Sequence, residues 1–301
     1  MKKRTIAALM TALLLTLSAC GAPKAPAADD DTLHVLATTY PVYLFTTAVT
    51  QGVDGVEVSL LINQQTSCLH DYTLTTNDMK AIEGADVIVK SGAGLEDFMD
   101  DALAQSKADV IDCSTDIDLL PTPEHAGHDG HDHEEEYDPH IWMSTPTATV
   151  MLNNILHGLN RLDKAHTDAY TANFQAAVDL LPENPLENNT LAHPNLITFH
   201  DGFQYFALDS DLTILKSIEE EEGSEASASD IKEIVALIKE YDLPAIFTER
   251  NGSTATADAI ARETGVKVYQ LDMIMSGDGT GIQPYVDAMN KNYETVLEAL
   301  K

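Results

Sequence analysis

Basic residues, cysteines and long apolar runs are all scarce in this sequence of 301 residues. Lys and Arg together number 17 against 49 Asp and Glu, so the formal net charge is −32. Because nucleic acid is bound mainly through its phosphates, a surface this acidic excludes a nucleic-acid partner and favours cations. The two cysteines that follow Cys20, Cys68 and Cys113, are too few for a disulfide framework, and the sequence leaves open whether they pair.

Only the N-terminal apolar run, residues 6–17, approaches the length of a membrane span. It follows Lys2, Lys3 and Arg4, and its shortness is typical of a secretion signal. The small residues before Cys20 resemble a bacterial lipobox, in which that cysteine becomes the lipidated first residue of the mature chain. Ordinary signal cleavage beside an incidental cysteine is the alternative. We therefore expect a signal peptide over residues 1–19 and a lipid-anchored tether, rich in Ala, Pro and Asp, over residues 20–31.

A His-rich run lies between the two halves of the chain, within residues 124–136. Imidazoles and carboxylates this dense are hard to bury, because each would need a partner in the core. Such a composition predicts a loop that gathers metal ions, and a solvated acidic loop is a compatible description of its conformation. The run supplies a set of accessory metal-binding candidates: His125, His128, His131 and His133.

Strand and helix signals alternate on both sides of this run and predict two α/β lobes. The first lobe is assigned to residues 32–145, with strands near 34–38, 56–62, 87–89 and 110–111. The second is assigned to residues 182–301, with strands near 196–199, 213–218, 245–247 and 266–271. A long linking helix near 146–162 and a following helix, together residues 146–181, join them. The expected fold class is α/β, with a mostly parallel four-stranded sheet flanked by helices in each lobe.

Four metal-capable side chains are predicted at strand or helix ends, where open α/β sheets bind ligands. His70 follows the second strand, His140 precedes the linking helix, and His200 and Asp272 end strands of the second half. Three imidazoles and one carboxylate make a four-coordinate set that zinc accepts. Because two members come from each half, the metal is predicted to lie between the lobes. Cys68 is a competing ligand, and hydrogen bonding or helix capping is the alternative role of each residue taken alone.

Several short motifs resemble a known family over nearly the whole mature chain. They are Ala37-Thr38-Thr39-Tyr40-Pro41, His70-Asp71-Tyr72, Gly84-Ala85-Asp86-Val87, Asp138-Pro139-His140-Ile141-Trp142, His200-Asp201-Gly202-Phe203 and Glu263-Thr264-Gly265. The chain resembles the solute-binding lipoproteins of bacterial zinc and manganese ABC importers. The resemblance implies that the family's metal ligands correspond to His70, His140, His200 and Asp272. Zinc members have His at the third position, where manganese members tend to have Glu.

The resemblance implies a binding protein and not an enzyme. We expect a monomer, lipid-anchored at the outer face of the cytoplasmic membrane, that captures zinc between two lobes and delivers it to an ABC permease and its ATPase. Manganese is the alternative cargo, and a metal-stabilised surface adhesin is an alternative function. A secreted zinc hydrolase is disfavoured, because four protein ligands close the site and no His-Glu-x-x-His or Gly-x-Ser-x-Gly pattern occurs.

Overall fold

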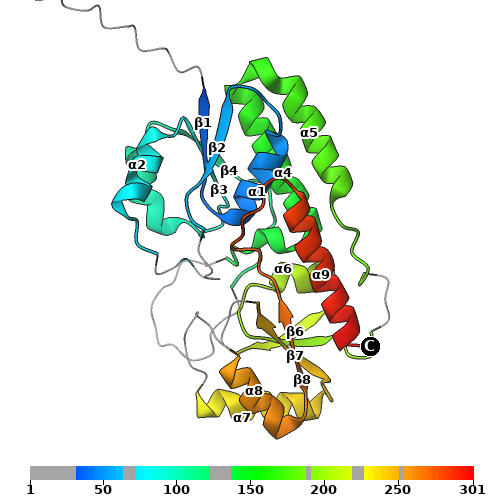
Figure 1. Ribbon diagram of the computed structural model, residues 1–301. Helices are drawn as coiled ribbons and strands as arrows, with labels where there is room; N and C mark the ends of the chain where they lie inside the picture. Colours follow the sequence, from blue (N-terminus) through cyan, green and yellow to red (C-terminus); the bar gives the residue numbers. More distant parts are fainter. Residues whose placement is uncertain are drawn as a thin grey trace, which may run out of the picture. The chain divides into compact units, whose positions relative to one another are not determined.

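Two parallel four-stranded sheets organise the protein (Figure 1). The computed structural model describes residues 32–63, 69, 72–122, 137–187, 191–218, 227–250 and 254–301. The first sheet has the order β2-β1-β3-β4, and the second has the order β6-β5-β7-β8. Their strands are β1 (Leu33–Ala37), β2 (Val56–Leu60), β3 (Val87–Lys90), β4 (Asp109–Asp112), β5 (Asn195–Thr198), β6 (Thr213–Ser217), β7 (Ala245–Glu249) and β8 (Lys267–Leu271).

The eight strands coincide with those predicted from the sequence, apart from one or two residues at their ends. Central strands such as β3 carry uninterrupted buried residues, from Val87 to Val89, because helices cover both faces of a parallel sheet. The predicted fold class, two four-stranded α/β lobes joined by a long helix, is confirmed.

The helices of the first half follow the strands in the expected alternation. They are α1 (Tyr40–Val49), α2 (Thr76–Gly84), the 3-10 turn η1 (Asp97–Met99), α3 (Asp100–Gln105), the 3-10 turn η2 (Ile141–Met143), α4 (Thr145–Leu162), the 3-10 turn η3 (Lys164–His166) and α5 (Thr167–Leu180). Pro41 and Pro146 lie in the first turns of α1 and α4, where a missing backbone N–H costs nothing. Thr75 caps α2 in a capping box with Asp78.

The second half contains α6 (Gln204–Asp209), α7 (Ala228–Glu240), α8 (Ala255–Thr264) and α9 (Gln283–Ala299). Gly265 ends α8 in the left-handed conformation, with φ of +83°, as a glycine at that position permits. The sequence analysis missed α6. Its six residues are too few to show a helical period, and Tyr205 and Phe206 favour strands when read alone.

Residues 32–301 form one compact unit in which both halves share a hydrophobic core. The linking helix α4 packs against α1 and α5, while α9 contacts both α1 and β8 (Figure 1). An aromatic contact joins the halves: Phe45 of α1 meets Tyr285 of α9 edge to face, at 5.0 Å between ring centroids. Within the second half, Phe206 of α6 stacks on Tyr293 of α9 at 5.3 Å. The lobes are therefore held by packed side chains as well as by the chain connections.

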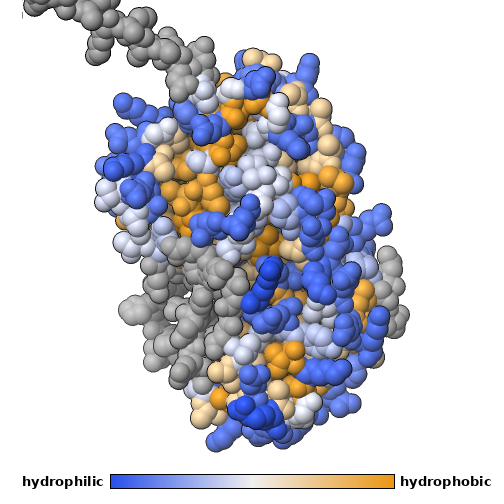
Figure 2. Space-filling view, viewed as in Figure 1, coloured by the Kyte–Doolittle hydropathy of each residue, from blue (hydrophilic) through white to orange (hydrophobic). Residues whose placement is uncertain are grey.

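Hydrophilic side chains cover most of the face shown in Figure 2, and its apolar residues form separate patches. Among the helices that the structure describes, none combines the length and the apolar composition of a membrane span. Cys113 is a buried free thiol, and burial, with Asp112 and Glu96 adding to the effect, raises its pKa well above the usual value. The predicted signal peptide, the predicted tether with Cys20, and Cys68, whose pairing with Cys113 the sequence leaves open, lie outside the described residues.

Candidate metal centre

Two of the four predicted ligands, His140 and His200, meet at the boundary between the two halves. Their Nε2 atoms are 3.3 Å apart, and the two rings stand nearly perpendicular, at 82° with centroids 5.1 Å apart. Each residue is only 6% exposed. Sixty residues of chain separate these two imidazoles, so their approach is a product of the tertiary fold.

His140 is oriented by the carboxylate two residues before it. Oδ1 of Asp138 accepts hydrogen bonds from the backbone N of His140 at 2.9 Å and from its Nδ1 at 2.8 Å. The second bond places the imidazole proton on Nδ1, which leaves the Nε2 lone pair directed at His200. The Asp-Pro-His order thus fixes both the ring orientation and the tautomer of a single imidazole.

Asp138 is itself held by α6 of the other half. Gln204 donates from Nε2 to Oδ2 of Asp138 at 3.1 Å, and the Tyr205 hydroxyl donates to the Asp138 carbonyl at 3.1 Å. The Tyr205 oxygen also accepts from the backbone N of Leu120 at 3.0 Å. Burial raises the pKa of Tyr205 to about 12, so its hydroxyl stays a proton donor at all ordinary pH values. The orientation of His140, a predicted ligand of the first half, therefore depends on two side chains of the second.

His200 lies just beyond the end of β5, beside Glu249 at the end of the neighbouring strand β7. Its Nδ1 is 3.8 Å from Oε1 of Glu249, within ion-pair distance. Strand order in this sheet changes direction between β5 and β7, and crevices at such points are where open α/β sheets bind ligands. His200 thus resembles His140 in having a carboxylate on its Nδ1 side.

Gly202 has no side chain, and its backbone therefore lies close against the His140 ring. A Cβ added at this glycine would lie 2.3 Å from Cε of Met273 and 2.9 Å from Cδ2 of His140. No side chain fits in that space without moving the imidazole or the methionine. The glycine of the His200-Asp201-Gly202-Phe203 motif is therefore explained by the position of His140.

Asp272, the predicted carboxylate ligand, is engaged elsewhere in this structure. Its Oδ2 accepts from Nη1 of Arg250 at 2.8 Å, and its Oδ1 accepts from the backbone N of Ile274 at 2.8 Å. Within the described residues, no group of three or more His, Cys, Asp or Glu side chains is gathered at one point. The structure thus brings together His140 and His200 but not Asp272.

The remaining predicted ligands lie outside the described residues. These are His70 and its competitor Cys68, together with the accessory histidines His125, His128, His131 and His133. Their assignment stays a prediction.

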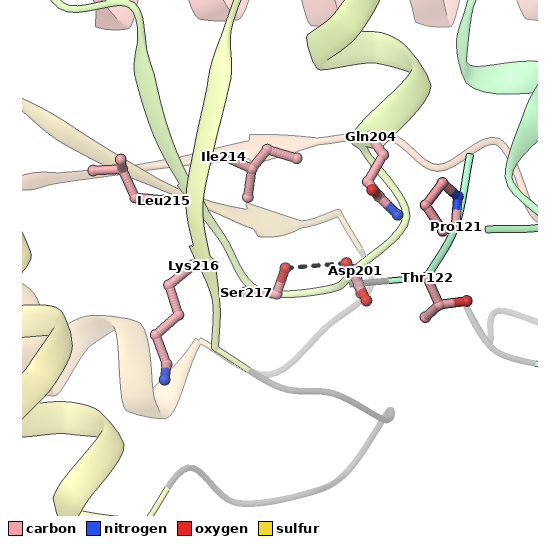
Figure 3. A pocket seen from close by; sticks show the side chains of 8 residues that line it. All are labelled: Pro121, Thr122, Asp201, Gln204, Ile214, Leu215, Lys216 and Ser217. Carbon is pink, nitrogen blue, oxygen red and sulfur yellow. Dashed lines mark hydrogen bonds between the residues drawn. The ribbon is translucent and has the colours of Figure 1, made fainter. Parts of the chain in front are cut away.

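A pocket of about 530 Å³ borders the centre on the side of β6 (Figure 3). Gln204, which holds Asp138, lines it together with Asp201, the residue after His200. The Ser217 hydroxyl donates to Oδ1 of Asp201 at 3.4 Å across the pocket wall. Its other lining residues are Pro121, Thr122, Ile214, Leu215 and Lys216. The pocket thus brings solvent-accessible space next to the residues that orient His140.

The chemistry of the paired imidazoles favours a cation. The Nε2 atoms of both rings face each other in a buried position, and each ring has a carboxylate on its Nδ1 side. Two lone pairs at this distance repel unless a proton or a metal ion lies between them, and imidazole is a ligand suited to zinc, copper and nickel. A model of the family described as "Zinc-uptake complex component A periplasmic" matches residues 35–299. The chain belongs to this family.

Two relatives are named as zinc-binding or zinc-uptake proteins. The zinc-binding lipoprotein AdcA of Streptococcus pneumoniae serotype 4 is 30% identical over 306 residues, which cover 95% of this chain and 58% of that protein. The high-affinity zinc uptake system protein ZnuA of Bacillus subtilis strain 168 is 28% identical over 320 residues, 97% of this chain and 96% of that protein. This chain spans only 55–58% of the length of the streptococcal AdcA proteins.

A solved structure supports the same fold. The laminin-binding protein Lmb of Streptococcus agalactiae, described as a bifunctional protein with adhesin and metal transporting activity, superposes with a TM-score of 0.75. The two chains are 28% identical, and the match covers 89% of this chain and 100% of that one. The family resemblance drawn from the sequence motifs is therefore confirmed by the family model, a full-length relative and a solved structure.

The sequence analysis assigned no orienting carboxylate to any of the predicted ligands. The structure assigns Asp138 to His140 and places Glu249 beside His200, while Asp201 bonds to Ser217. The sequence analysis missed Gln204 and Arg250, because each contacts a residue far along the chain, 66 and 22 positions away. The only local signal was the spacing of Asp138 and His140, which favours a carboxylate–imidazole pair.

Proposed function

We propose that this protein captures a zinc ion between its two halves and delivers it to an ABC permease for import. The ion is the cargo, and the proposed ligands are Nε2 of His140 and of His200, with His70 and Asp272 completing a four-coordinate set. In this proposal the protein binds and releases the ion without any catalytic step. The family description, a periplasmic component of a zinc-uptake complex, supports this role.

One distance carries the proposal. Two nitrogen ligands that each lie about 2.0–2.1 Å from a tetrahedral zinc are about 3.3 Å apart. The Nε2 atoms of His140 and His200 are separated by 3.3 Å. The two imidazoles are thus already spaced as one edge of a zinc tetrahedron, and they need little rearrangement to bind.

The carboxylates behind the imidazoles support the same role. A ligating histidine in zinc proteins commonly donates its other ring N–H to a carboxylate, which orients the ring and increases its basicity. Asp138 occupies that position for His140, and Glu249 lies on the corresponding side of His200. Because neutral imidazole is the binding form, affinity is expected to fall in acid.

Location and partners follow from the family and the N-terminal sequence. The family is described as periplasmic, so we propose that the protein acts outside the cytoplasm, held at the outer face of the membrane through lipid on Cys20. A monomer that exchanges its ion with a permease and its ATPase is the proposed working unit. The net charge of −32 attracts cations to the surface from which they enter.

Zinc titration of two variants tests the proposal. The unmodified chain is expected to bind one zinc tightly, and His140→Ala to bind it more than about a hundredfold more weakly, because an inner ligand is worth more than the residue that orients it. His157→Ala is the matched control, since His157 is an exposed histidine on α4. Wild-type affinity in His140→Ala, with the fold intact by circular dichroism, would refute the proposed site.

A surface adhesin is the second candidate function, because Lmb is described as both an adhesin and a metal transporter. Transport requires an ion that leaves, whereas a structural ion stays in place. Exchange of bound zinc with a chelator within seconds to minutes would favour transport. An ion that leaves only on unfolding would favour the adhesin.

A further inference from the structure

Asp272 is held by an arginine of the adjacent strand end. Arg250 follows the last residue of β7, and Asp272 follows the last residue of β8, its neighbour in the sheet. The Arg250 backbone N also donates to the Leu271 carbonyl at 2.9 Å, which continues the ladder by one bond and aligns the two side chains. The resulting contact between Nη1 and Oδ2 measures 2.8 Å.

The backbone of Asp272 is fixed on both sides. Its N–H donates to Oδ1 of Asn292, and its carbonyl accepts from Nδ2 of the same side chain, both at 2.8 Å. Two residues later Ile274 takes φ of +62°, a conformation that a β-branched residue adopts only when its surroundings impose it. Asn292 thus holds the backbone of Asp272, while the carboxylate itself is held by the backbone N of Ile274 through Oδ1 and by Arg250 through Oδ2.

The next residue along the chain, Met273, already reaches the paired imidazoles. Its carbonyl accepts from Nε1 of Trp142 at 2.8 Å, and its Cε borders the same space at Gly202 as the His140 ring. Asp272 is thus attached to a segment that packs on the metal centre, yet its carboxylate belongs to no cluster of three metal-capable side chains among the residues described. The observed side-chain contact of Oδ2 is the one with Arg250.

We propose that Arg250 is an internal competitor for the metal: its guanidinium occupies Oδ2 of Asp272, and an entering cation displaces it. This inference rests on the proposed function, in which Asp272 is a ligand. Arg250 is 70% exposed and Asp272 23% exposed, so the pair is weak enough to open. When zinc replaces the guanidinium of Arg250, the charge of the Asp272 carboxylate stays compensated. The reverse exchange, in which Arg250 replaces zinc, gives the protein a way to release the ion.

Replacing Arg250 with Gln tests the competition. Without the guanidinium, the carboxylate is available from the start, so zinc is expected to bind tighter by up to about fivefold, the factor that corresponds to an exposed ion pair. Arg161→Gln is the matched control. Arg161 makes a similar exposed ion pair with Asp109 at 3.2 Å, and its substitution removes the same positive charge. Unchanged or weaker zinc binding in Arg250→Gln would overturn the proposal.

A double-mutant cycle with Asp272→Asn separates competition from a general effect of charge. Asp272→Asn is expected to weaken zinc binding, and adding Arg250→Gln to it should then change nothing further. If Arg250→Gln tightens binding equally in both backgrounds, the arginine acts through its field and the proposed competition is wrong. Wild-type affinity in Asp272→Asn would also overturn it, because Asp272 would not be a ligand.

Ionic strength supplies an independent readout. Salt screens an exposed ion pair, so the affinity ratio between Arg250→Gln and the unmodified chain should shrink as salt increases from about 0.01 M to about 1 M. A ratio that does not depend on salt would contradict the competition. The His140→Ala variant separates this proposal from the proposed function. If His140→Ala loses tight zinc binding while Arg250→Gln binds zinc with unchanged affinity, only the role of Arg250 is refuted.

Discussion

Asp138 offers the sharpest test of how the metal centre is built, because it touches the proposed ligand without being one. The residue is 1% exposed and accepts three side-chain or backbone hydrogen bonds through its carboxylate, two from His140 and one from Gln204. We expect Asp138→Asn to weaken zinc binding and Asp138→Ala to weaken it further, with the imidazole of His140 present in both variants.

The expected size follows from what each substitution removes. Asparagine keeps one oxygen for His140, and Gln204 can turn its amide to meet the new NH2 group, so mainly the negative charge is lost. Removing the partner of a ligating histidine typically weakens metal affinity 10- to 100-fold, which is about 1.4–2.7 kcal/mol. We therefore expect about tenfold for Asp138→Asn and about a hundredfold for Asp138→Ala, where the ring also loses its orientation.

Competition titration against a zinc chelator of known affinity measures these differences, with thermal unfolding followed in parallel. Asp138→Ala is expected to lower stability as well, by about 1–3 kcal/mol, because buried donors of His140 lose their acceptor. Affinity is therefore compared under conditions in which each variant remains folded by circular dichroism.

A second Asp–His pair in the same chain is the control. Oδ2 of Asp163 accepts from Nδ1 of His166 at 2.6 Å and from the Tyr170 hydroxyl at 2.7 Å, in the turn between α4 and α5. Asp163→Asn should leave zinc affinity unchanged. Wild-type affinity in both Asp138 variants would refute the orienting role of Asp138, and equal losses in Asp138→Asn and Asp163→Asn would show that the effect is not local.

Four further outcomes are expected. Zinc should bind more tightly than manganese in a buffered competition, following ligand softness and the Irving–Williams order, and equal affinities would contradict the three-histidine set. Deleting residues 125–133 should abolish weak extra zinc equivalents but leave the tightest affinity nearly unchanged, because ordering that run costs about 1–2 kcal/mol per residue; loss of the tight phase would reverse this hierarchy. Cys20→Ser should release the protein from the membrane fraction, whereas unchanged lipid labelling would exclude lipidation at this cysteine. Burial opposes ionisation of Asp163, but hydrogen bonds from His166 and Tyr170 outweigh this effect and lower the pKa of its carboxyl. The stability that the carboxylate contributes is therefore present above the ordinary Asp pKa and is lost as pH falls through the lowered value. Asp163→Asn should accordingly flatten the decrease of Tm at acidic pH.

Local pattern was sufficient for the secondary structure and for the fold class. The eight strands and most helices were recognisable because a sheet buried on both faces requires short apolar runs, and amphipathic helices require a period of 3.6 residues. The helix α6 was the exception, since six residues carry no period. That omission mattered for the site, because α6 supplies Gln204 and Tyr205, which hold Asp138.

The side chains available for metal, and their approximate places along the chain, can be read from local pattern, since His140, His200 and Asp272 follow or precede regular elements. Three features depend on the packing of the whole molecule: the two imidazoles meet at 3.3 Å, Asp138 orients one of them, and Arg250 holds Asp272. The difference lies in the range of the interactions. A strand or helix is specified by neighbours within a few residues, whereas a metal centre is specified by the directions in which distant side chains point, and these depend on how the two halves pack.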